Sequence, residues 1–161
     1  AEPRDLLVVA ALKGSFMFAA DLIRALHRAG LAPHVEFTHL SSYRTSTISS
    51  GQVTILKDVD SEVRGRDVLL VDDILESGRT LAFAKDLLAA RGARRVETCV
   101  LLEKPGKRSV NVDPDHVGFV CPDLFVVGYG MDVAHAYRQL PFVGVVEHDA
   151  DDKQGELALH G

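Results

Sequence analysis

The sequence has no tryptophan, only two cysteines among its 161 residues, and no apolar run long enough to cross a membrane. A membrane-spanning helix needs about 20 consecutive apolar residues, and the opening AEPRDLLVVAAL lacks the long apolar core of a signal peptide. Cys99 and Cys121 stand far apart in apolar surroundings, which indicates buried free thiols in a reducing compartment. We therefore expect a cytoplasmic protein without a disulfide framework and without membrane contact.

An excess of basic residues is also lacking. The formal net charge is −5, and acidic and basic residues are mixed along the whole chain. Binding of nucleic acid needs a basic face or stripe, so the charge pattern argues against a nucleic-acid partner. A phosphate-bearing ligand would have to be held by a local site.

What the sequence does contain is a regular alternation of apolar runs and helical segments. Four short apolar runs are bounded by glycine, proline or charged residues, and they are 6–11, 68–71, 96–102 and 125–127. Runs without polar alternation suit strands that are buried on both faces of a parallel sheet. Helical spacing of apolar residues covers 16–29 and 80–91, and these stretches stop at Gly30 and Gly92.

Strands that alternate with helices predict an α/β fold with a doubly wound, mostly parallel sheet, and in such folds ligands bind at the carboxyl ends of the strands. The length and the apolar fraction of 47% suit one domain, 1–161. The hydroxyl-rich segment 41–52 carries no apolar periodicity and is interpreted as a flexible loop, followed by a strand. The polar C-terminal tail, 149–161, is expected to be frayed.

The segment VLLVDDILESGRT, residues 68–80, predicts a phosphate site of the strand, loop and helix type. An apolar strand ends in Asp72 and Asp73, and a helix begins near Thr80. Gly78 lets the backbone approach a ligand, Ser77 and Thr80 offer hydroxyls, and a helix N-terminus favours an anion. The segment is not a P-loop and lacks the glycine triplet of dinucleotide-binding folds.

The two adjacent carboxylates repel each other unless a cation or hydroxyl groups lie between them. They suit a ribose diol or a hydrated magnesium ion. An isolated Asp-Asp pair more often only begins a turn. The apolar strand before Asp72 and the ESGRT sequence after Asp73 together favour the ligand site.

VLLVDDILESGRT resembles the phosphoribosyl-pyrophosphate signature of the type I phosphoribosyltransferases. The resemblance implies that Asp72 and Asp73 hold the ribose hydroxyls and that the following loop wraps the 5′-phosphate. The implied phosphoribosyl-binding residues are Asp72, Asp73, Ile74, Leu75, Glu76, Ser77, Gly78, Arg79 and Thr80. Glu76 stands where the family usually has Asp, the residue proposed to exchange a proton with N7 of the purine, so Glu76 is the implied catalytic residue. Its extra methylene would move the carboxyl by about one bond length.

The resemblance extends from Leu6 to about Glu147 and is to the hypoxanthine-guanine branch in particular. It implies the type I phosphoribosyltransferase fold, in which a small hood accompanies the doubly wound sheet. ALKGSFMFAADL is similar to the family's pyrophosphate loop, where the Leu-Lys-Gly step often contains a non-proline cis peptide, and it implies roles for Lys13 and Gly14. By itself, Lys13 could be only a solvated charge after a strand.

Two further landmarks concern the pyrophosphate. HLSSYRTSTISSG is similar to the mobile catalytic loop whose Ser-Tyr pair, here Ser42 and Tyr43, closes over the donor and excludes water. Arg138 matches an arginine that contacts the pyrophosphate. Composition alone leaves an ordinary surface loop open as the alternative for 41–52.

Two segments are similar to the purine pocket of the family. In LLEKPGKRS, Lys104 matches the lysine that donates to the oxygen at purine C6, which would favour a 6-oxopurine over adenine. In PDLFVVGYGMD, the match implies that Phe125 stacks on the base, that the Val126 backbone reads its edge, and that Asp132 binds magnesium on the pyrophosphate. By themselves, Lys104 could be a turn lysine and Phe125 a core residue.

The resemblance implies a purine-salvage enzyme that transfers phosphoribosyl from phosphoribosyl pyrophosphate (PRPP) to hypoxanthine and guanine, giving IMP or GMP and pyrophosphate. Mg²⁺ is the implied cofactor, with Asp132, Asp72 and Asp73 as candidate ligands, because the available ligands are carboxylate oxygens and the substrate itself. The alternatives are a xanthine-preferring transferase and a non-catalytic regulator that senses PRPP. The family usually forms homodimers or homotetramers. The sequence starts almost directly at the first predicted strand, without the N-terminal helical segment that the family normally carries.

Overall fold

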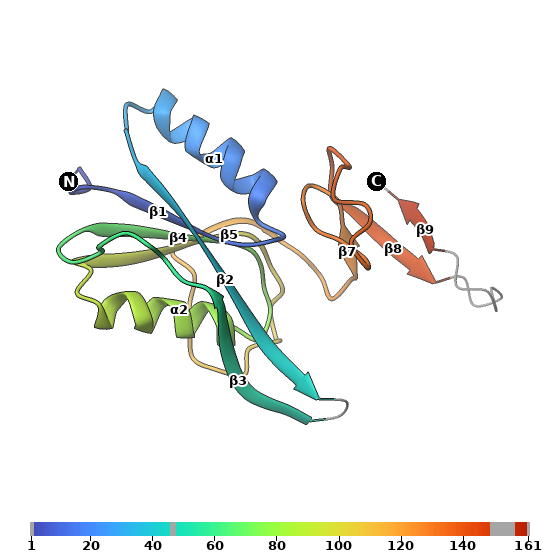
Figure 1. Ribbon diagram of the computed structural model, residues 1–161. Coiled ribbons are helices and arrows are strands. Elements are labelled where there is room, and N and C mark those ends of the chain that lie inside the picture. Colours follow the sequence, from blue (N-terminus) through green and yellow to red (C-terminus); the bar gives the residue numbers. More distant parts are fainter. Residues whose placement is uncertain (1, 46–47, 149–156, 161) are drawn as a thin grey trace.

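The structure is a computed structural model that describes residues 2–45, 48–148 and 157–160. Its centre is a six-stranded sheet with the strand order β3-β2-β1-β4-β5-β6 (Figure 1). The strands of this sheet are β1 (Leu7–Ala11), β2 (His34–Thr45), β3 (Ile48–Lys57), β4 (Asp67–Leu75), β5 (Arg95–Glu103) and β6 (His116–Val120). All neighbouring pairs are parallel except β2 and β3, which pair antiparallel. The predicted, mostly parallel α/β sheet is confirmed.

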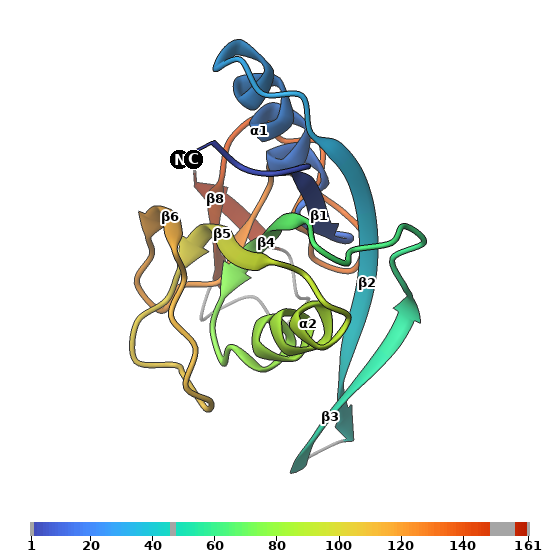
Figure 2. The same ribbon diagram turned by 90° about the vertical axis from the view of Figure 1, so that its left-hand side faces the viewer.

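Two helices, α1 (Phe16–Arg28) and α2 (Arg79–Ala90), cover opposite faces of the sheet (Figure 2). Val8 of β1 belongs to the apolar cluster that contains Ala19 of α1, whereas Val9 belongs to the cluster that contains Leu81 of α2. Successive residues of a strand point to opposite faces, so both faces of β1 are buried. This explains the uninterrupted apolar run and confirms the doubly wound arrangement.

Both helices end as the sequence predicts. Gly30 and Gly92 follow the last helical turns with φ angles of 91°, in the left-handed region that glycine adopts without steric cost. Within the ranges that the structure describes, no helix is long and apolar enough to cross a membrane.

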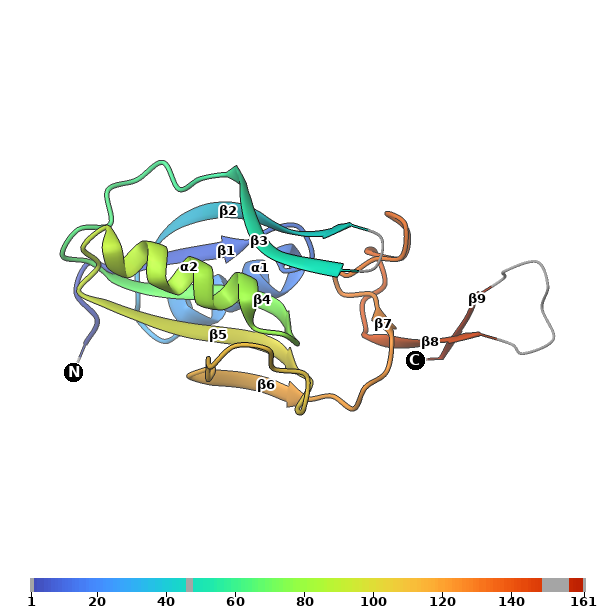
Figure 3. The same ribbon diagram turned by 90° about the horizontal axis from the view of Figure 1, so that it is seen from below.

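A smaller antiparallel sheet consists of β7 (Val126–Val127), β8 (Gly144–His148) and β9 (Leu157–His160). It lies beyond the carboxyl ends of the parallel strands (Figures 1 and 3). The expectation of a frayed tail is wrong for 157–160, because the backbone of β9 pairs with β8 from Val145 to His148. Such pairing uses main-chain groups and does not depend on apolar side chains. The rest of the expected tail, 149–156 and 161, lies outside the described residues.

The segment 41–52 also differs from its expectation as a loop without regular structure. Residues 41–45 and 48–52 lie in β2 and β3, which form a long hairpin with Ser42 opposite Val53. The two strands are held together by main-chain hydrogen bonds, which do not require a regular pattern of apolar side chains. Residues 46 and 47 lie outside the described residues, and the mobility of this hairpin stays a prediction.

Candidate active site

The connection between β4 and α2 is tighter than the sequence predicted. β4 does not end at Asp72 and Asp73 but continues to Leu75, because Asp72 pairs with Val100 and Leu75 with Glu103 of β5. The helix begins at Arg79, which confirms the predicted start near Thr80. The loop is therefore reduced to 76–78, which we call the phosphate loop. Gly78, at the N-cap of α2, has a φ of 82°, a left-handed conformation that favours glycine.

The adjacent carboxylates are organised by the backbone of the same strand. The amide of Asp73 donates to Oδ1 of Asp72 at 2.8 Å, and the amide of Ile74 donates to Oδ1 of Asp73 at 2.7 Å. Desolvation, and then the neighbouring charge of Asp73, raise the pKa of Asp72 well above its usual value. A cation or a pair of hydroxyl groups beside the two carboxylates would relieve this electrostatic cost.

The turn after β1 lies against this carboxylate pair. The peptide bond between Leu12 and Lys13 is cis, as the resemblance implied. A Cβ built on Gly14 would lie 2.0 Å from Oδ2 of Asp73, so only glycine leaves room for the carboxylate as it stands. Lys13, Gly14, Asp72, Asp73 and Thr80 are among the residues that line a cavity of about 200 Å³.

A neighbouring cavity of about 400 Å³ joins the turn after β1 to the segment around β7. Its predicted members are Lys13, Gly14, Asp73, Ile74, Phe125, Val126, Asp132 and Arg138. The fold thus brings residues implied for the pyrophosphate and for the purine into one space. His39, Met131 and His135 also line this cavity, although no pattern in the sequence assigns them a role.

Arg138 and Asp132 are fixed to each other at the wall of this cavity. Nη2 of Arg138 lies 3.2 Å from Oδ2 of Asp132, and its Nη1 donates to the carbonyl of Gly130 at 2.7 Å. The amide of His135 donates to the same carboxylate oxygen of Asp132 at 2.8 Å. A carboxylate and a guanidinium are therefore held in defined positions in the cavity that Lys13 also lines.

The two hydrophobic residues of the predicted purine segment differ in exposure. Phe125 is 56% exposed, whereas Val126 is only 7% exposed and belongs to the apolar cluster near β7. The ring of Phe125 is therefore accessible to a flat ligand.

Lys104 and Glu76 form an ion pair, and neither of them is among the residues that line the two cavities. Lys104 is 5% exposed, and its Nζ donates to Oε1 of Glu76 at 2.6 Å. Leu75 is 2% exposed and packs in the core on the α2 side, so its side chain cannot contact a ligand. Only the backbone of Leu75 remains available for the binding role that the resemblance implied.

Ser42 and Tyr43 are not brought to the two cavities in the described part of the chain. Both lie in β2, where Ser42 pairs with Val53 in the hairpin. The side chain of Tyr43 lies outside what is described, and the loop-closing role of the pair stays a prediction.

Residues that bond to the phosphate loop were missed, namely Arg108 and Ser109, whose amide donates to the carbonyl of Ser77 at 2.9 Å. Arg108 donates to the carbonyls of Glu76 and Val112 and to the carboxylate of Glu103. Its only signal in the sequence is its place in LLEKPGKRS, four residues after Lys104.

Residues 3–134 match the family model described as "Phosphoribosyl transferase domain". The chain belongs to the phosphoribosyltransferase family. It is 45% identical over 142 residues to the hypoxanthine phosphoribosyltransferase of Escherichia coli, a match that covers 88% of this chain and 78% of that protein. It resembles the crystal structure of a hypoxanthine phosphoribosyltransferase from Staphylococcus aureus with a TM-score of 0.83 and 41% identity, over 89% of this chain and 77% of the other.

A third relative is much longer. The bifunctional protein TilS/HprT of Listeria monocytogenes is 46% identical over 146 residues, which are 91% of this chain but only 22% of that protein. The chain therefore spans about a fifth of that relative. The similarities confirm the predicted family and its hypoxanthine-guanine branch.

The oxygen ligands of this phosphoribosyltransferase fit magnesium. Asp73 and Asp132 line the same cavity. Among the described residues, no group of three or more His, Cys, Asp or Glu side chains could hold a metal. Mg²⁺ typically takes one or two carboxylates and completes its shell with water and substrate phosphates, which is the arrangement that these separated carboxylates allow.

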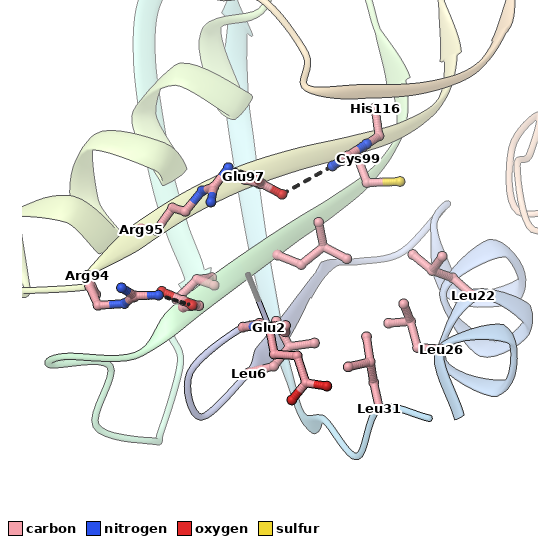
Figure 4. Close-up of a pocket in the computed structure, with 14 residues that line it drawn as sticks. Glu2, Leu6, Leu22, Leu26, Leu31, Arg94, Arg95, Glu97, Cys99 and His116 are labelled. Carbon is pink, nitrogen blue, oxygen red and sulfur yellow. Dashed lines mark hydrogen bonds and ion pairs between the residues drawn. The ribbon is translucent and has the colours of Figure 1, made fainter. Parts of the chain in front are cut away.

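Another cavity of the phosphoribosyltransferase, of about 630 Å³, lies at the amino ends of the strands, because Asp67, Arg95 and His116, the first residues of β4, β5 and β6, line it. Figure 4 shows the residues around this cavity. Leucines of α1 and of the adjoining segments form its apolar wall. The charged residues at its rim pair with one another, Arg94 with Asp67 and His116 with Glu97. Ligands of α/β sheets bind at the carboxyl ends of strands, so the active-site candidates remain the two cavities around Asp73.

Proposed function

We propose that this chain is a hypoxanthine-guanine phosphoribosyltransferase of purine salvage. It transfers phosphoribosyl from PRPP to hypoxanthine or guanine and releases pyrophosphate. The observation that carries the proposal is the ion pair between the buried Lys104 and Glu76, the first residue of the phosphate loop. It sets a hydrogen-bond donor for the purine oxygen beside a carboxylate that can exchange a proton. The names of the Escherichia coli and Staphylococcus aureus relatives support the same activity.

The donor's ribose 5-phosphate binds at the start of α2. Asp72 and Asp73 accept hydrogen bonds from the ribose hydroxyls, and the phosphate loop and the first turn of α2 take the 5′-phosphate. The N-terminus of a helix presents unpaired amides and a positive dipole end, both of which favour a phosphate. The left-handed Gly78 lets the loop turn into the helix without a side chain in the way.

The pyrophosphate leaves into the cavity of about 400 Å³ that Lys13 and Arg138 line. Lys13, Gly14 and Arg138 stabilise its developing charge, and Ser42 and Tyr43 close over it and exclude water. Asp132, together with Asp72 and Asp73, holds Mg²⁺. When bound, the cation neutralises charge on the pyrophosphate.

The purine binds between Phe125 and the Lys104–Glu76 pair. Phe125 stacks on the base, the Val126 backbone and Asp132 border it, and Lys104 donates to the oxygen at C6. An amino group at C6 cannot accept this hydrogen bond and would leave the ammonium unpaired, so adenine is rejected.

The reaction is a direct displacement at the anomeric carbon with inversion. The bond from C1 of the ribose to N9 of the purine forms as the bond from C1 to the pyrophosphate oxygen breaks. Glu76 exchanges the purine proton at N7. Asp72 and Asp73 hold the ribose hydroxyls while positive charge develops at C1.

We extend the proposal to the protein as a whole. Residues 1–161 form a single domain, and the protein acts in the cytoplasm as a homodimer or homotetramer. The preference among hypoxanthine, guanine and xanthine depends on the shape of the pocket around purine C2.

An ultraviolet assay with PRPP and Mg²⁺ tests the function. Hypoxanthine, guanine, xanthine and adenine are offered separately, and each reaction is repeated with a chelator. We expect chelator-sensitive nucleotide formation from hypoxanthine or guanine and none from adenine. Turnover of xanthine alone would favour the xanthine-preferring alternative. PRPP binding without turnover of any purine would contradict the enzyme and favour a PRPP-sensing regulator.

A further inference from the structure

Three consecutive carbonyl groups of the site face the same neighbouring segment. The carbonyl of Leu75 accepts from the amide of Lys104 at 3.0 Å, and that of Ser77 accepts from the amide of Ser109 at 2.9 Å. Between them, the carbonyl of Glu76 accepts from Nη1 of Arg108 at 3.0 Å. The two outer contacts are main-chain contacts, so the central one is the contact that a substitution can remove.

This arrangement fixes the direction of the loop's amides. In a trans peptide the C=O and N–H groups point to opposite sides of the chain, and the peptides of the phosphate loop are trans. Carbonyls held toward residues 104–109 therefore turn the N–H groups of Glu76, Ser77 and Gly78 away from that segment. Successive amides that face one side form a concave site for anions.

Arg108 is itself held rigidly. Its Nη2 donates to Oε1 of Glu103 at 2.8 Å, and its Nε donates to the carbonyl of Val112 at 3.1 Å. The Arg108 side chain is 22% exposed, and that of Glu103 is 24% exposed. The planar guanidinium has several donors in a fixed arrangement, so these partners determine where Nη1 points.

The loop also packs directly against the stem of Arg108. A Cβ on Gly78 would lie 2.4 Å from Cγ1 of Val112 and 3.3 Å from Cδ of Arg108. The backbone at Gly78 is therefore confined between α2 and the segment that Arg108 anchors.

We propose that Arg108 is a positioning residue for the donor. It holds the phosphate loop in the conformation in which the loop amides bind the 5′-phosphate of PRPP. The inference rests on the proposed function, because it names the residue that organises the donor half of that site. Among the described residues, Arg108 lines neither the cavity of about 200 Å³ nor the cavity of about 400 Å³. Arg108 bonds to the main chain of Glu76, whereas the Glu76 carboxylate is held by Lys104, so the main effect of Arg108 is expected on donor binding.

Steady-state kinetics of Arg108→Gln test the proposal, with Lys107→Gln as the matched control. Lys107 belongs to the same segment, and its ion pair with Asp123 is exposed, so its substitution removes one positive charge without loosening the loop. For Arg108→Gln we expect the KM for PRPP to rise about tenfold, with kcat and the KM for hypoxanthine within about threefold of wild type. Lys107→Gln should leave all three constants unchanged.

Glu103→Gln is the second variant, because it loosens Arg108 without removing it. It should raise the KM for PRPP in the same direction by a smaller factor, and Arg108→Lys should restore part of the loss. Wild-type donor KM in Arg108→Gln would overturn the proposal. So would equal losses in kcat and in the KM values of both substrates, since these would indicate general disruption.

Calorimetric titration with ribose 5-phosphate separates this inference from the proposed function. If the wild-type protein turns over no purine, the proposed activity fails. About tenfold weaker binding of ribose 5-phosphate to Arg108→Gln than to wild type would then still support the positioning role. Equal binding of ribose 5-phosphate by wild type and variant would overturn that role, whatever the activity of the wild type.

Discussion

The carboxylate of Asp73 lies against the backbone of Gly14, where a Cβ would stand 2.0 Å from its Oδ2. The nearest atom is the tip of a flexible side chain, and Cβ of Asp73 is at an ordinary 3.6 Å. We therefore expect Gly14→Ala to turn the Asp73 carboxylate aside while costing less than about 1 kcal/mol of unfolding free energy. Donor kinetics and thermal unfolding measure the two effects, and the KM for PRPP should rise at least about tenfold.

A double-mutant cycle tests whether Gly14→Ala raises the KM for PRPP by displacing the carboxylate of Asp73. In the Asp73→Asn background, Gly14→Ala should raise the KM for PRPP little further, because both changes act on the same carboxylate. If the effects of the two substitutions on the KM for PRPP were fully additive, Gly14→Ala would act by some means other than displacing the Asp73 carboxylate.

Asp72 and Asp73 are expected to act on the donor. The double substitution Asp72→Asn and Asp73→Asn should raise the KM for PRPP and lower turnover by about tenfold to a hundredfold, because two charged acceptors for the ribose hydroxyls are lost. Initial rates at varied PRPP measure this. Asp86→Asn, on the exposed face of α2, is the control. Unchanged donor kinetics in the double variant would exclude the diol role.

Lys104→Ala should weaken turnover of hypoxanthine and guanine by a factor of about ten to a thousand, since a charge-assisted contact to the 6-oxo group is lost. Lys107→Ala is the matched control, because Lys107 is exposed and pairs with Asp123 outside the site. Single-purine rate measurements on both variants decide the matter. A Lys104→Ala enzyme with wild-type rates would refute the assignment.

Two variants of Glu76 test separately whether its proposed proton exchange depends on the charge and on the length of its side chain. Glu76→Gln keeps the shape but cannot exchange a proton, so kcat should fall by about a hundredfold. Glu76→Asp keeps the carboxylate that the family usually has, and should remain at least about tenfold more active than Glu76→Gln. Measurement of kcat against pH for both variants tests this expectation. Equal activity of wild type and Glu76→Gln would show that another group handles the proton.

The pair of Asp67 and Arg94 should make stability sensitive to acid. The Arg94 guanidinium, and then the amide of Arg4, lower the pKa of Asp67 to about 2 from the usual 3.8. Because the pKa is lower in the folded state, the stabilisation is complete above about pH 4 and is lost as the pH falls toward about 2. Arg94 is partly exposed, with 42% of its side chain accessible, so we expect Asp67→Asn to cost only about 1–2 kcal/mol at pH 7.

Urea unfolding at several pH values measures this difference. The difference in free energy of unfolding between wild type and Asp67→Asn should become smaller as the pH falls from about 4 to about 2. Asp60→Asn is the control, because the Asp60 side chain is 84% exposed in its pair with Lys57. If this difference in free energy of unfolding did not depend on pH, Asp67 would stabilise the fold by something other than its charge.

Much of the donor site could be read from the sequence, since its parts are neighbours in the chain. The apolar strand, Asp72, Asp73, Gly78 and the helix that follows form one continuous segment. Strand, loop and helix conformations there depend on local spacing and on glycine's access to positive φ. The family was also recognisable from these residues, and the match to residues 3–134 confirms it.

Contacts between distant segments could not be read in this way. The sequence predicted that β4 ends at Asp72 and Asp73, but pairing with β5 extends it to Leu75. It also gave no sign that 157–160 forms a strand, because β9 exists through its pairing with β8.

The sequence by itself determined the α/β class, the carboxylate pair and the glycine that starts α2, because each depends on short-range pattern. Only the tertiary structure decided that Lys104 meets Glu76, 28 positions away, and that Arg108 donates to the carbonyl of Glu76 in the phosphate loop. These contacts arise where β4 and β5 lie side by side and bring the segments that follow them together. The physical reason is that a parallel sheet aligns the carboxyl ends of strands that are far apart in sequence.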